Sequence, residues 1–264
     1  MTILTHNLYP FVNNALKEAG HQVIYTESSQ KLEKMLTKHQ PDAAIIFGWD
    51  KNCQKFIETH DPAFLRRKHL HFLNRRTATQ ALDDAALAKY PKRYYIAPAS
   101  NQQARIADFG ALSEHADNVI DWVMKWGDAH QGKDKRLVTR PKDNLRLSML
   151  PREEVILEPF VQGRSIRVLI IQGKVWKIEH VNRKTWIKNV DPDQEVINPE
   201  GIPQEMINQA MAVSTKYGLD LVGVDFQLGK DGQIFPLEIN VMPGVPEDDG
   251  IKKAYTQYFL DLVK

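Results

Sequence analysis

The stretch that most constrains the fold of this chain is LVGVDFQLGKDGQIFPLEINV, residues 221–241. It contains two runs in which apolar residues alternate with polar or small ones, a pattern typical of strands with one buried face. The turn-forming segment GKDGQ separates them, so the stretch predicts an antiparallel β-hairpin. A four-residue loop over 230–233 would place Asp225 directly opposite Glu238, with Asn240 next along the same face.

Two facing carboxylates repel each other across a strand pair unless a cation lies between them. Carboxylate and amide oxygens suit a hard cation, Mg²⁺ above all, which leaves coordination positions for phosphates. The alternative is a solvated face, because antiparallel sheets commonly have one wet side. Two features favour the metal interpretation. The second strand runs into Pro243-Gly244, where backbone N–H groups can approach a ligand, and a basic loop lies upstream.

That basic loop follows Lys125, which ends a predicted strand and precedes Gly127 and Gly132. A lysine ammonium can bind phosphate as a point charge, and a glycine-bearing loop can present backbone N–H groups. The loop is not a Walker A sequence, because Asp134 stands where that pattern needs Ser or Thr. A hairpin turn with solvated lysines is the alternative.

A further unusual feature is ILEPFV, where Glu158 precedes Pro159 between apolar residues. Proline removes a backbone donor and favours an edge strand or a connection between lobes. Neighbouring backbone groups would then be available to pair with a planar base. The alternative is an edge strand that simply begins at a proline.

The first seventy residues alternate short apolar runs with helical patterns, which predicts a small parallel sheet with crossover helices. Its strands are TILTH, QVIYTE and DAAIIFGW, and Ser28 or Ser29 is expected to cap the second helix. A helix is expected over about 77–87. Residues 94–140 predict a smaller mixed unit with the strands YYIAP, VIDWVMKW and KRLVT.

From Val155 the pattern changes to antiparallel strands, beginning with EVILEPFV. A hairpin is expected to fold back at Gln172-Gly173-Lys174. Helical periodicity over 204–217 ends at Gly218, a C-cap residue, and a last helix covers 251–263.

Composition excludes some classes of protein. A net charge of +2 gives no reason to expect a nucleic-acid or membrane partner, and the longest apolar runs are far short of a membrane span. The single cysteine, Cys53, cannot form an internal disulfide, which suits a reducing compartment. With an N-terminus too polar for a signal peptide, a cytoplasmic location is expected.

Together, these motifs resemble the ATP-grasp superfamily, and within it the RimK-type and glutathione-synthetase-like carboxylate–amine ligases. The resemblance covers about 74–260 and is strongest in VGVDFQL…FPLEINVMPG. It implies an α/β (α+β) protein with the ATP-grasp fold, in which two lobes grip ATP behind a small Rossmann-like α/β lobe. The expected units are an N-terminal lobe at 1–73, a small lobe with a flexible loop at 74–151, and a large lobe with the metal and nucleotide site at 152–264.

The resemblance also implies roles for individual residues. Mg²⁺, with Mn²⁺ as the alternative ion, would be bound by Asp225, Glu238 and Asn240. The remaining expected roles concern ATP and the substrates. The phosphates of ATP would meet Arg75, Lys125, Gln131 and Gly132; its adenine would meet the Glu158 side chain and the backbone of Pro159, Phe160 and Val161; its ribose would meet Ser165; and Arg167 would hold the substrate carboxylate or its acyl-phosphate, with Arg183, Lys184, Lys188 and Gly244 as substrate candidates.

Some positions depart from the family pattern. Ser165 stands where related ligases often use an acid on the ribose, and the loop has few glycines. Gly223 stands where D-alanine–D-alanine ligases have an arginine, which argues against that branch. The RimK substrate segment is replaced by EHVNRKTWIKNVDPD, whose basic residues serve either an anionic substrate or a charged hairpin edge.

The function expected from the resemblance is ATP-dependent amide-bond formation between a carboxylate and an amine, through an acyl-phosphate. The chain's partners would be these small molecules, and a homo-oligomer is compatible with this function. Two alternatives stay open at this point: an ATP-grasp kinase that stops at phosphoryl transfer, and a nucleotide-binding module without turnover.

Overall fold

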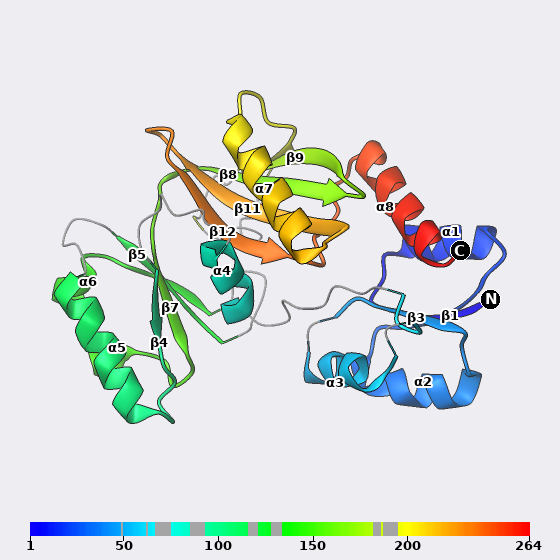
Figure 1. Cartoon of the computed structure of the whole chain (residues 1–264), viewed down its shortest axis with the longest axis horizontal. Coiled ribbons are helices and arrows are strands. Elements are labelled where there is room, and N and C mark those ends of the chain that lie inside the picture. Colours follow the sequence, from blue (N-terminus) through cyan, green and yellow to red (C-terminus); the bar gives the residue numbers. More distant parts are fainter. Residues whose placement is uncertain are drawn as a thin grey trace.

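The computed structural model describes residues 1–48, 50–61, 63–66, 75–84, 93–115, 121–127, 134–181, 186 and 195–264. The strands of these residues form three sheets, with orders β2-β1-β3, β4-β7-β5-β6 and β10-β9-β8-β11-β12. The first sheet is parallel and the other two are antiparallel. Figure 1 shows three distinct sheets, with the five-stranded sheet between the other two. The predicted α/β class is confirmed.

The parallel sheet forms the N-terminal unit, as its alternating strands and helices predict. Both faces of this sheet are buried along β1 and β3, so Ile3 and Ile45 on one face pack with one hydrophobic cluster, and Leu4 and Ala44 on the other face pack with another. The first cluster continues into the five-stranded sheet, which joins the two units through a shared core. The elements of this unit are β1 (Thr2–His6), α1 (Pro10–Glu18), β2 (Gln22–Thr26), the 3₁₀ turn η1 (Ser29–Lys31), α2 (Leu32–His39), β3 (Ala43–Ile46) and α3 (Lys51–Thr59).

The expected serine cap on the second helix is wrong. A 3₁₀ turn intervenes, so α2 begins at Leu32, and neither η1 nor α2 has a side-chain cap. The Ser29 hydroxyl instead accepts a hydrogen bond of 3.3 Å from the Asn52 side chain. A side-chain cap is found on α3, where the Asp50 carboxylate accepts from the backbone N–H groups of Asn52 and Cys53. The carboxylate there satisfies donors that a helix start otherwise leaves unpaired.

The four-stranded sheet contains a strand that the sequence suggested for the next unit. β7, expected among the antiparallel strands after Val155, pairs with β4 and β5. The chain therefore passes to the five-stranded sheet only after Pro159. The elements of this unit are β4 (Tyr94–Ile96), α5 (Gln102–His115), β5 (Trp122–Trp126), β6 (Lys135–Val138), α6 (Pro141–Asn144), the 3₁₀ turn η2 (Leu147–Met149) and β7 (Val155–Pro159).

The five-stranded sheet follows the predicted pattern closely. The hairpin folds at Gln172 and Gly173, whose φ angles of 48° and 76° are those of a tight two-residue loop. Helix α7 ends at Gly218 with φ 62°, the predicted left-handed C-cap. Three helices accompany this sheet: α4 packs on β12, α7 packs on β8 and β11, and α8 packs beside α1 (Figure 1). The elements of this unit are α4 (Arg75–Asp84), β8 (Gly163–Ile171), β9 (Lys174–Val181), β10 (Glu195–Ile197), α7 (Gln204–Tyr217), β11 (Leu221–Gly229), β12 (Ile234–Asn240) and α8 (Asp249–Leu262).

The acidic hairpin reaches its predicted register by an unpredicted route. The Gly229 N–H donates to the Gln233 carbonyl at 2.7 Å, so the pairing near the turn is one residue out of the expected register. A β-bulge between Asp225 and Phe226 restores it, because the partner strand has an extra residue there, Leu237. Asp225 therefore lies opposite Glu238, as predicted.

The junction between β8 and β11 allows no side chain at Gly163. A Cβ built there would lie 2.0 Å from the Leu228 carbonyl oxygen, which is backbone and cannot rotate away. We expect Gly163→Ala to lower the free energy of unfolding by about 1–3 kcal/mol through overpacking. The measurement is the urea midpoint at constant m-value.

The matched control is Gly110→Ala in α5, where an added Cβ meets no heavy atom of the described residues within 4 Å. Alanine reduces the freedom of the unfolded chain, so this variant should gain about 0.4–1 kcal/mol. Equal effects from the two substitutions would contradict the close approach at Gly163.

Among the described residues, no helix has the length and apolarity to cross a bilayer.

Candidate active site

The predicted metal residues converge on a buried guanidinium. Arg167 on β8 and Asp225 on β11 are direct partners in the sheet register. The Arg167 Nε and Nη2 donate to the Asp225 carboxylate oxygens at 2.7 and 2.9 Å, a bidentate pair. Asn240 at the end of β12 donates from Nδ2 to the same carboxylate at 2.9 Å. Residues predicted separately as metal ligands and as the substrate-holding arginine therefore form one network.

The Arg167–Asp225 pair is almost removed from solvent, because Arg167 is 8% exposed and Asp225 is 2% exposed. Burial alone would lower the pKa of Arg167, but the Asp225 carboxylate raises that pKa above its ordinary value, and Glu238 adds to the effect. The guanidinium therefore stays charged. It holds the Asp225 carboxylate in place and compensates its negative charge.

Glu238 is the more open of the two facing carboxylates. Its side chain is 34% exposed, and its Oε2 lies 3.9 Å from the Lys135 Nζ. Asp225 and Glu238 both offer oxygens, and Asn240, which donates through Nδ2, retains its amide oxygen as an acceptor. An all-oxygen set of this kind fits Mg²⁺ or Mn²⁺.

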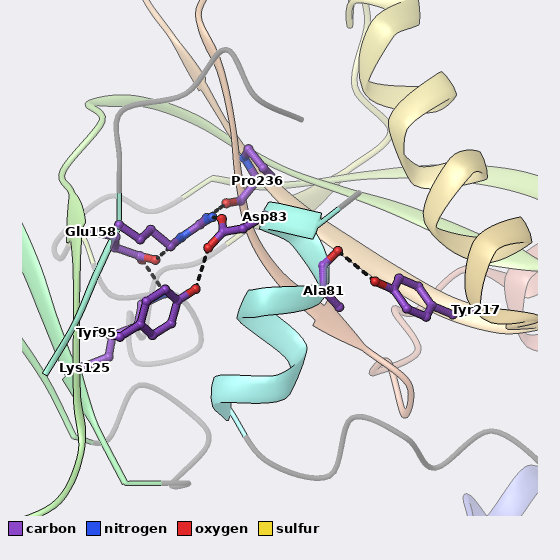
Figure 2. Close-up of polar contacts among 8 residues, drawn as sticks. Ala81, Asp83, Tyr95, Lys125, Glu158, Tyr217 and Pro236 are labelled. Atoms are coloured by element: carbon purple, nitrogen blue, oxygen red, sulfur yellow. Dashed lines mark hydrogen bonds and ion pairs between the residues drawn. The ribbon is translucent and has the colours of Figure 1, made fainter. Parts of the chain in front are cut away.

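A second ionic cluster lies between the four-stranded sheet and the acidic hairpin (Figure 2). Lys125 on β5 forms an ion pair with Glu158 on β7, and both are buried. The buried Arg93 reaches the same Glu158 carboxylate at 3.4 Å. It also donates to Asp83 on α4 and to the Pro236 carbonyl on β12.

This cluster ties the predicted phosphate-binding lysine to the strand that carries Glu238. Burial lowers the pKa of Lys125 from its usual value, although Glu158 opposes the shift. Tyr95 extends the cluster by donating its hydroxyl to Asp83 at 2.5 Å. Because the Glu158 carboxylate contacts two cations here, its expected contact with adenine stays a prediction.

Arg93 was missed by the reading of the sequence. It stands directly before the apolar strand YYI, after a stretch with further basic residues, and nothing in that pattern separates a buried arginine from a solvated one. Its role becomes visible only when β4, β7 and β12 are brought together.

The predicted adenine hinge lies at the end of β7. The Phe160 N–H donates to the Asp121 carbonyl at 2.7 Å. The Phe160 ring meets Trp186 edge-on, with ring centroids 5.8 Å apart. Trp186 is 36% exposed, and its ring contact is with Phe160. Val161 and Ser165 are half-buried, on either side of Gly163.

Gly244 lies beside Arg167, the arginine that pairs with Asp225. A Cβ built at Gly244 would lie 3.9 Å from both the Arg167 Nη1 and the Tyr9 hydroxyl. Tyr9 belongs to the N-terminal unit, and its hydroxyl accepts from the Val245 N–H at 3.2 Å. The predicted substrate glycine is thus adjacent to Arg167 and to the first unit.

The remaining predicted site residues have side chains outside the described part of the chain. Arg75 begins α4, but its side chain is outside the described part of the chain. The loop residues Gln131 and Gly132 and the basic candidates Arg183, Lys184 and Lys188 also lie outside the described residues.

No family model matches the chain. Its sequence is similar to the D-alanine–D-alanine ligase of Aquifex aeolicus (strain VF5), with 25% identity over 272 residues that cover 96% of this chain and 90% of that protein. The fold is similar to D-cycloserine synthetase DcsG, with a TM-score of 0.64, 16% identity and full coverage of both chains. It is also similar to the ATP-grasp ligase PsnB complexed with a minimal precursor, with a TM-score of 0.62, 17% identity and coverage of 99% and 98%.

The two structures share their architecture with this chain along nearly its whole length, and the sequence relative is itself a ligase. These findings agree with the resemblance that was based on the sequence of the acidic hairpin and on Lys125. The chain therefore has the fold of an ATP-grasp ligase, and its sequence is similar to that of a ligase over 96% of its length.

Proposed function

We propose that the network of Asp225, Glu238, Asn240 and Arg167, together with Lys125, activates a substrate carboxylate with ATP and transfers its acyl group to an amine. One observation carries this assignment above all. Two carboxylates face each other in register, and the inner one is held by a buried, bidentate arginine. Arg167 compensates the charge of Asp225 and orients it, while the more exposed Glu238 presents further carboxylate oxygens on the same face, the ligand type that a hard cation prefers.

Asp225, Glu238 and Asn240 would hold Mg²⁺, with Mn²⁺ as the alternative. When bound, the ion would compensate charge on the phosphates of ATP. The partial exposure of Glu238 supports this role, because it leaves a path for the ion and the phosphates from solvent. Arg167 and Asn240 fix the orientation of Asp225 beforehand, so little reorganisation is needed.

Lys125 would contact the phosphates of ATP from the four-stranded sheet. Its pairing with Glu158 and the contacts of Arg93 hold it at a fixed position relative to β12. Arg167, beside Gly244, would bind the substrate carboxylate or the acyl-phosphate formed from it. The boundary between the second and third expected lobes, 74–151 and 152–264, would move to Pro159, because β7 pairs within the four-stranded sheet, and nucleotide would lie between these two lobes.

The proposed reaction balances as two displacements. A carboxylate oxygen of the substrate attacks the γ-phosphorus, and ADP leaves. The amine nitrogen then attacks the acyl carbon, inorganic phosphate leaves and the nitrogen loses a proton. Positioning of the attacking oxygen and compensation of negative charge are the main requirements, so no nucleophilic side chain is needed.

The substrate class we propose is an amino acid, a peptide or a similar carboxylate, used in the cytoplasm. D-Alanine is not favoured, although the sequence relative is a D-alanine–D-alanine ligase. At Gly223, where that branch has an arginine, an added Cβ would lie 3.2 Å from the Arg167 Cδ and 3.0 Å from the Pro243 Cβ. The space is therefore already taken by Arg167.

The test is a screen of pooled amino acids and peptides with Mg-ATP, read by mass spectrometry and by free phosphate. The expected result is ADP, free phosphate and a condensed product formed with loss of one water. A phosphorylated product that accumulates without free phosphate would replace the ligase assignment with a kinase. Omission of each pool in turn identifies the carboxylate and the amine.

A further inference from the structure

A second cluster of metal-ligating side chains lies in the N-terminal unit, apart from the ligase residues. It is formed by His6 at the end of β1, Asp50 before α3 and Cys53 in the first turn of α3. One ligand atom from each lies within 4.8 Å of the other two. These side chains come together at the carboxyl ends of the parallel strands β1 and β3, the edge at which sheets of this kind bind ligands.

His6 is prepared as a ligand by its own hydrogen bond. It is 3% exposed, and its Nδ1 lies 3.0 Å from the Thr26 carbonyl oxygen. A carbonyl only accepts, so Nδ1 carries the proton and Nε2 carries the lone pair. Metal-binding histidines are commonly oriented by such a bond on the other nitrogen.

Gly48 keeps the space between the imidazole and the thiol open. A Cβ built at Gly48 would lie 2.5 Å from the Cys53 Sγ and 2.9 Å from the His6 Nε2. Any side chain at this position would fill the space beside both ligand atoms. Glycine at position 48 is therefore required by the approach of His6 and Cys53.

The carboxylate completes the set from the solvent side. The Asp50 Oδ1 accepts from the N–H groups of Asn52 and Cys53 at 2.8 and 3.0 Å, and Ser29 hydrogen-bonds to the same carboxylate. These bonds orient Asp50 toward the first turn of α3. Asp50 is exposed while His6 and Cys53 are buried, so an ion would enter from its side.

We propose that His6, Asp50 and Cys53 bind one transition-metal ion of the Zn²⁺ class, in addition to the Mg²⁺ used by the ligase site. Imidazole nitrogen and thiolate sulfur are ligands that Zn²⁺ favours and Mg²⁺ does not. Binding would replace the proton of the Cys53 thiol, which is released to solvent. With three protein ligands, the fourth position is left to water or to another small ligand.

The test is a titration of the chelator-treated whole chain with Co²⁺, and then with Zn²⁺ in competition. The expected result is a thiolate-to-cobalt charge-transfer band that saturates at one ion per chain and is abolished by Zn²⁺. Because Cys53 is the single cysteine, the band reports this cluster alone. The ligase site, which offers oxygens only, cannot produce it.

Three variants separate binding from folding. Cys53→Ser should abolish the band, while His6→Gln and Asp50→Asn should weaken Co²⁺ binding by more than about tenfold. Asp50→Asn also preserves the helix cap, because asparagine is an equally good N-cap residue, so its loss of binding is not a loss of fold. His39→Gln, on α2, is the control and should bind as the unchanged chain does.

A folded wild-type chain that shows no charge-transfer band at any Co²⁺ concentration would overturn the proposal. So would binding of equal strength in the Asp50→Asn and His39→Gln variants. Neither outcome depends on turnover, so the result is separate from the test of the ligase function.

Discussion

Replacing Glu238 with glutamine is expected to lower the turnover number by roughly 10²–10³-fold, the effect of losing one preorganised electrostatic group at a phosphoryl-transfer site. The substitution keeps the size of the side chain and removes the charge that would hold the metal ion. Because the Glu238 side chain is 34% exposed, the protein should keep its fold. The measurements are the steady-state rate of phosphate release and the urea midpoint of the same preparation.

The control for this prediction is Glu205→Gln in the first turn of α7. It makes the same chemical change on a helix that packs on β8 and β11, at a residue outside the proposed metal site. Its turnover should match the unchanged chain. Raised Mg²⁺ should also restore part of the rate of Glu238→Gln, because the remaining ligands, Asp225 and Asn240, still offer oxygens. An unaltered rate in Glu238→Gln would remove this residue from the metal site.

The largest effect on stability is expected at Asp225. Asp225→Ala should lower the free energy of unfolding by about 3–5 kcal/mol, because it leaves the buried Arg167 guanidinium without its bidentate partner. Asn240 would lose an acceptor as well. Urea unfolding measures the change, and turnover should be lost at the same time, since Asp225 is also a proposed metal ligand.

A double variant distinguishes the effect of an unpaired, buried Arg167 charge from a simple loss of packing. If Asp225→Ala is combined with Arg167→Met, the unpaired charge is gone, so the double variant should be more stable than Asp225→Ala alone. Lys264→Ala, which breaks the exposed pair with Asp261, serves as the control and should change stability little. Additive losses from Asp225→Ala and Arg167→Met would show that the pair is not coupled.

Much of the fold could be predicted because its strands and helices obey simple periodicities. The hairpin of residues 221–241 alternates cleanly, and the tight loop at Gln172-Gly173 needs positive φ angles, which suit glycine. Helix α5 was missed for a physical reason. Its middle contains Gly110, and its large residue Ile106 is 51% exposed, so no clear apolar stripe marks the helix.

The candidate site could be predicted only where its residues share one local element. Asp225 and Glu238 lie on one hairpin, so counting along the strands pairs them, and it does so because the shift at the turn and the β-bulge cancel. Arg93 could not be found in this way. Its partners Glu158, Asp83 and Pro236 come from distant segments, and only the packed fold brings them together.

The measurement that tests the central claim most directly follows the oxygen atoms of the substrate. Once the carboxylate is identified, it is labelled with ¹⁸O on both oxygens and turned over with Mg-ATP and the amine. Activation through an acyl-phosphate predicts that each phosphate released carries one ¹⁸O atom from the carboxylate. Phosphate released without label would show that ATP is cleaved by water and would contradict the account.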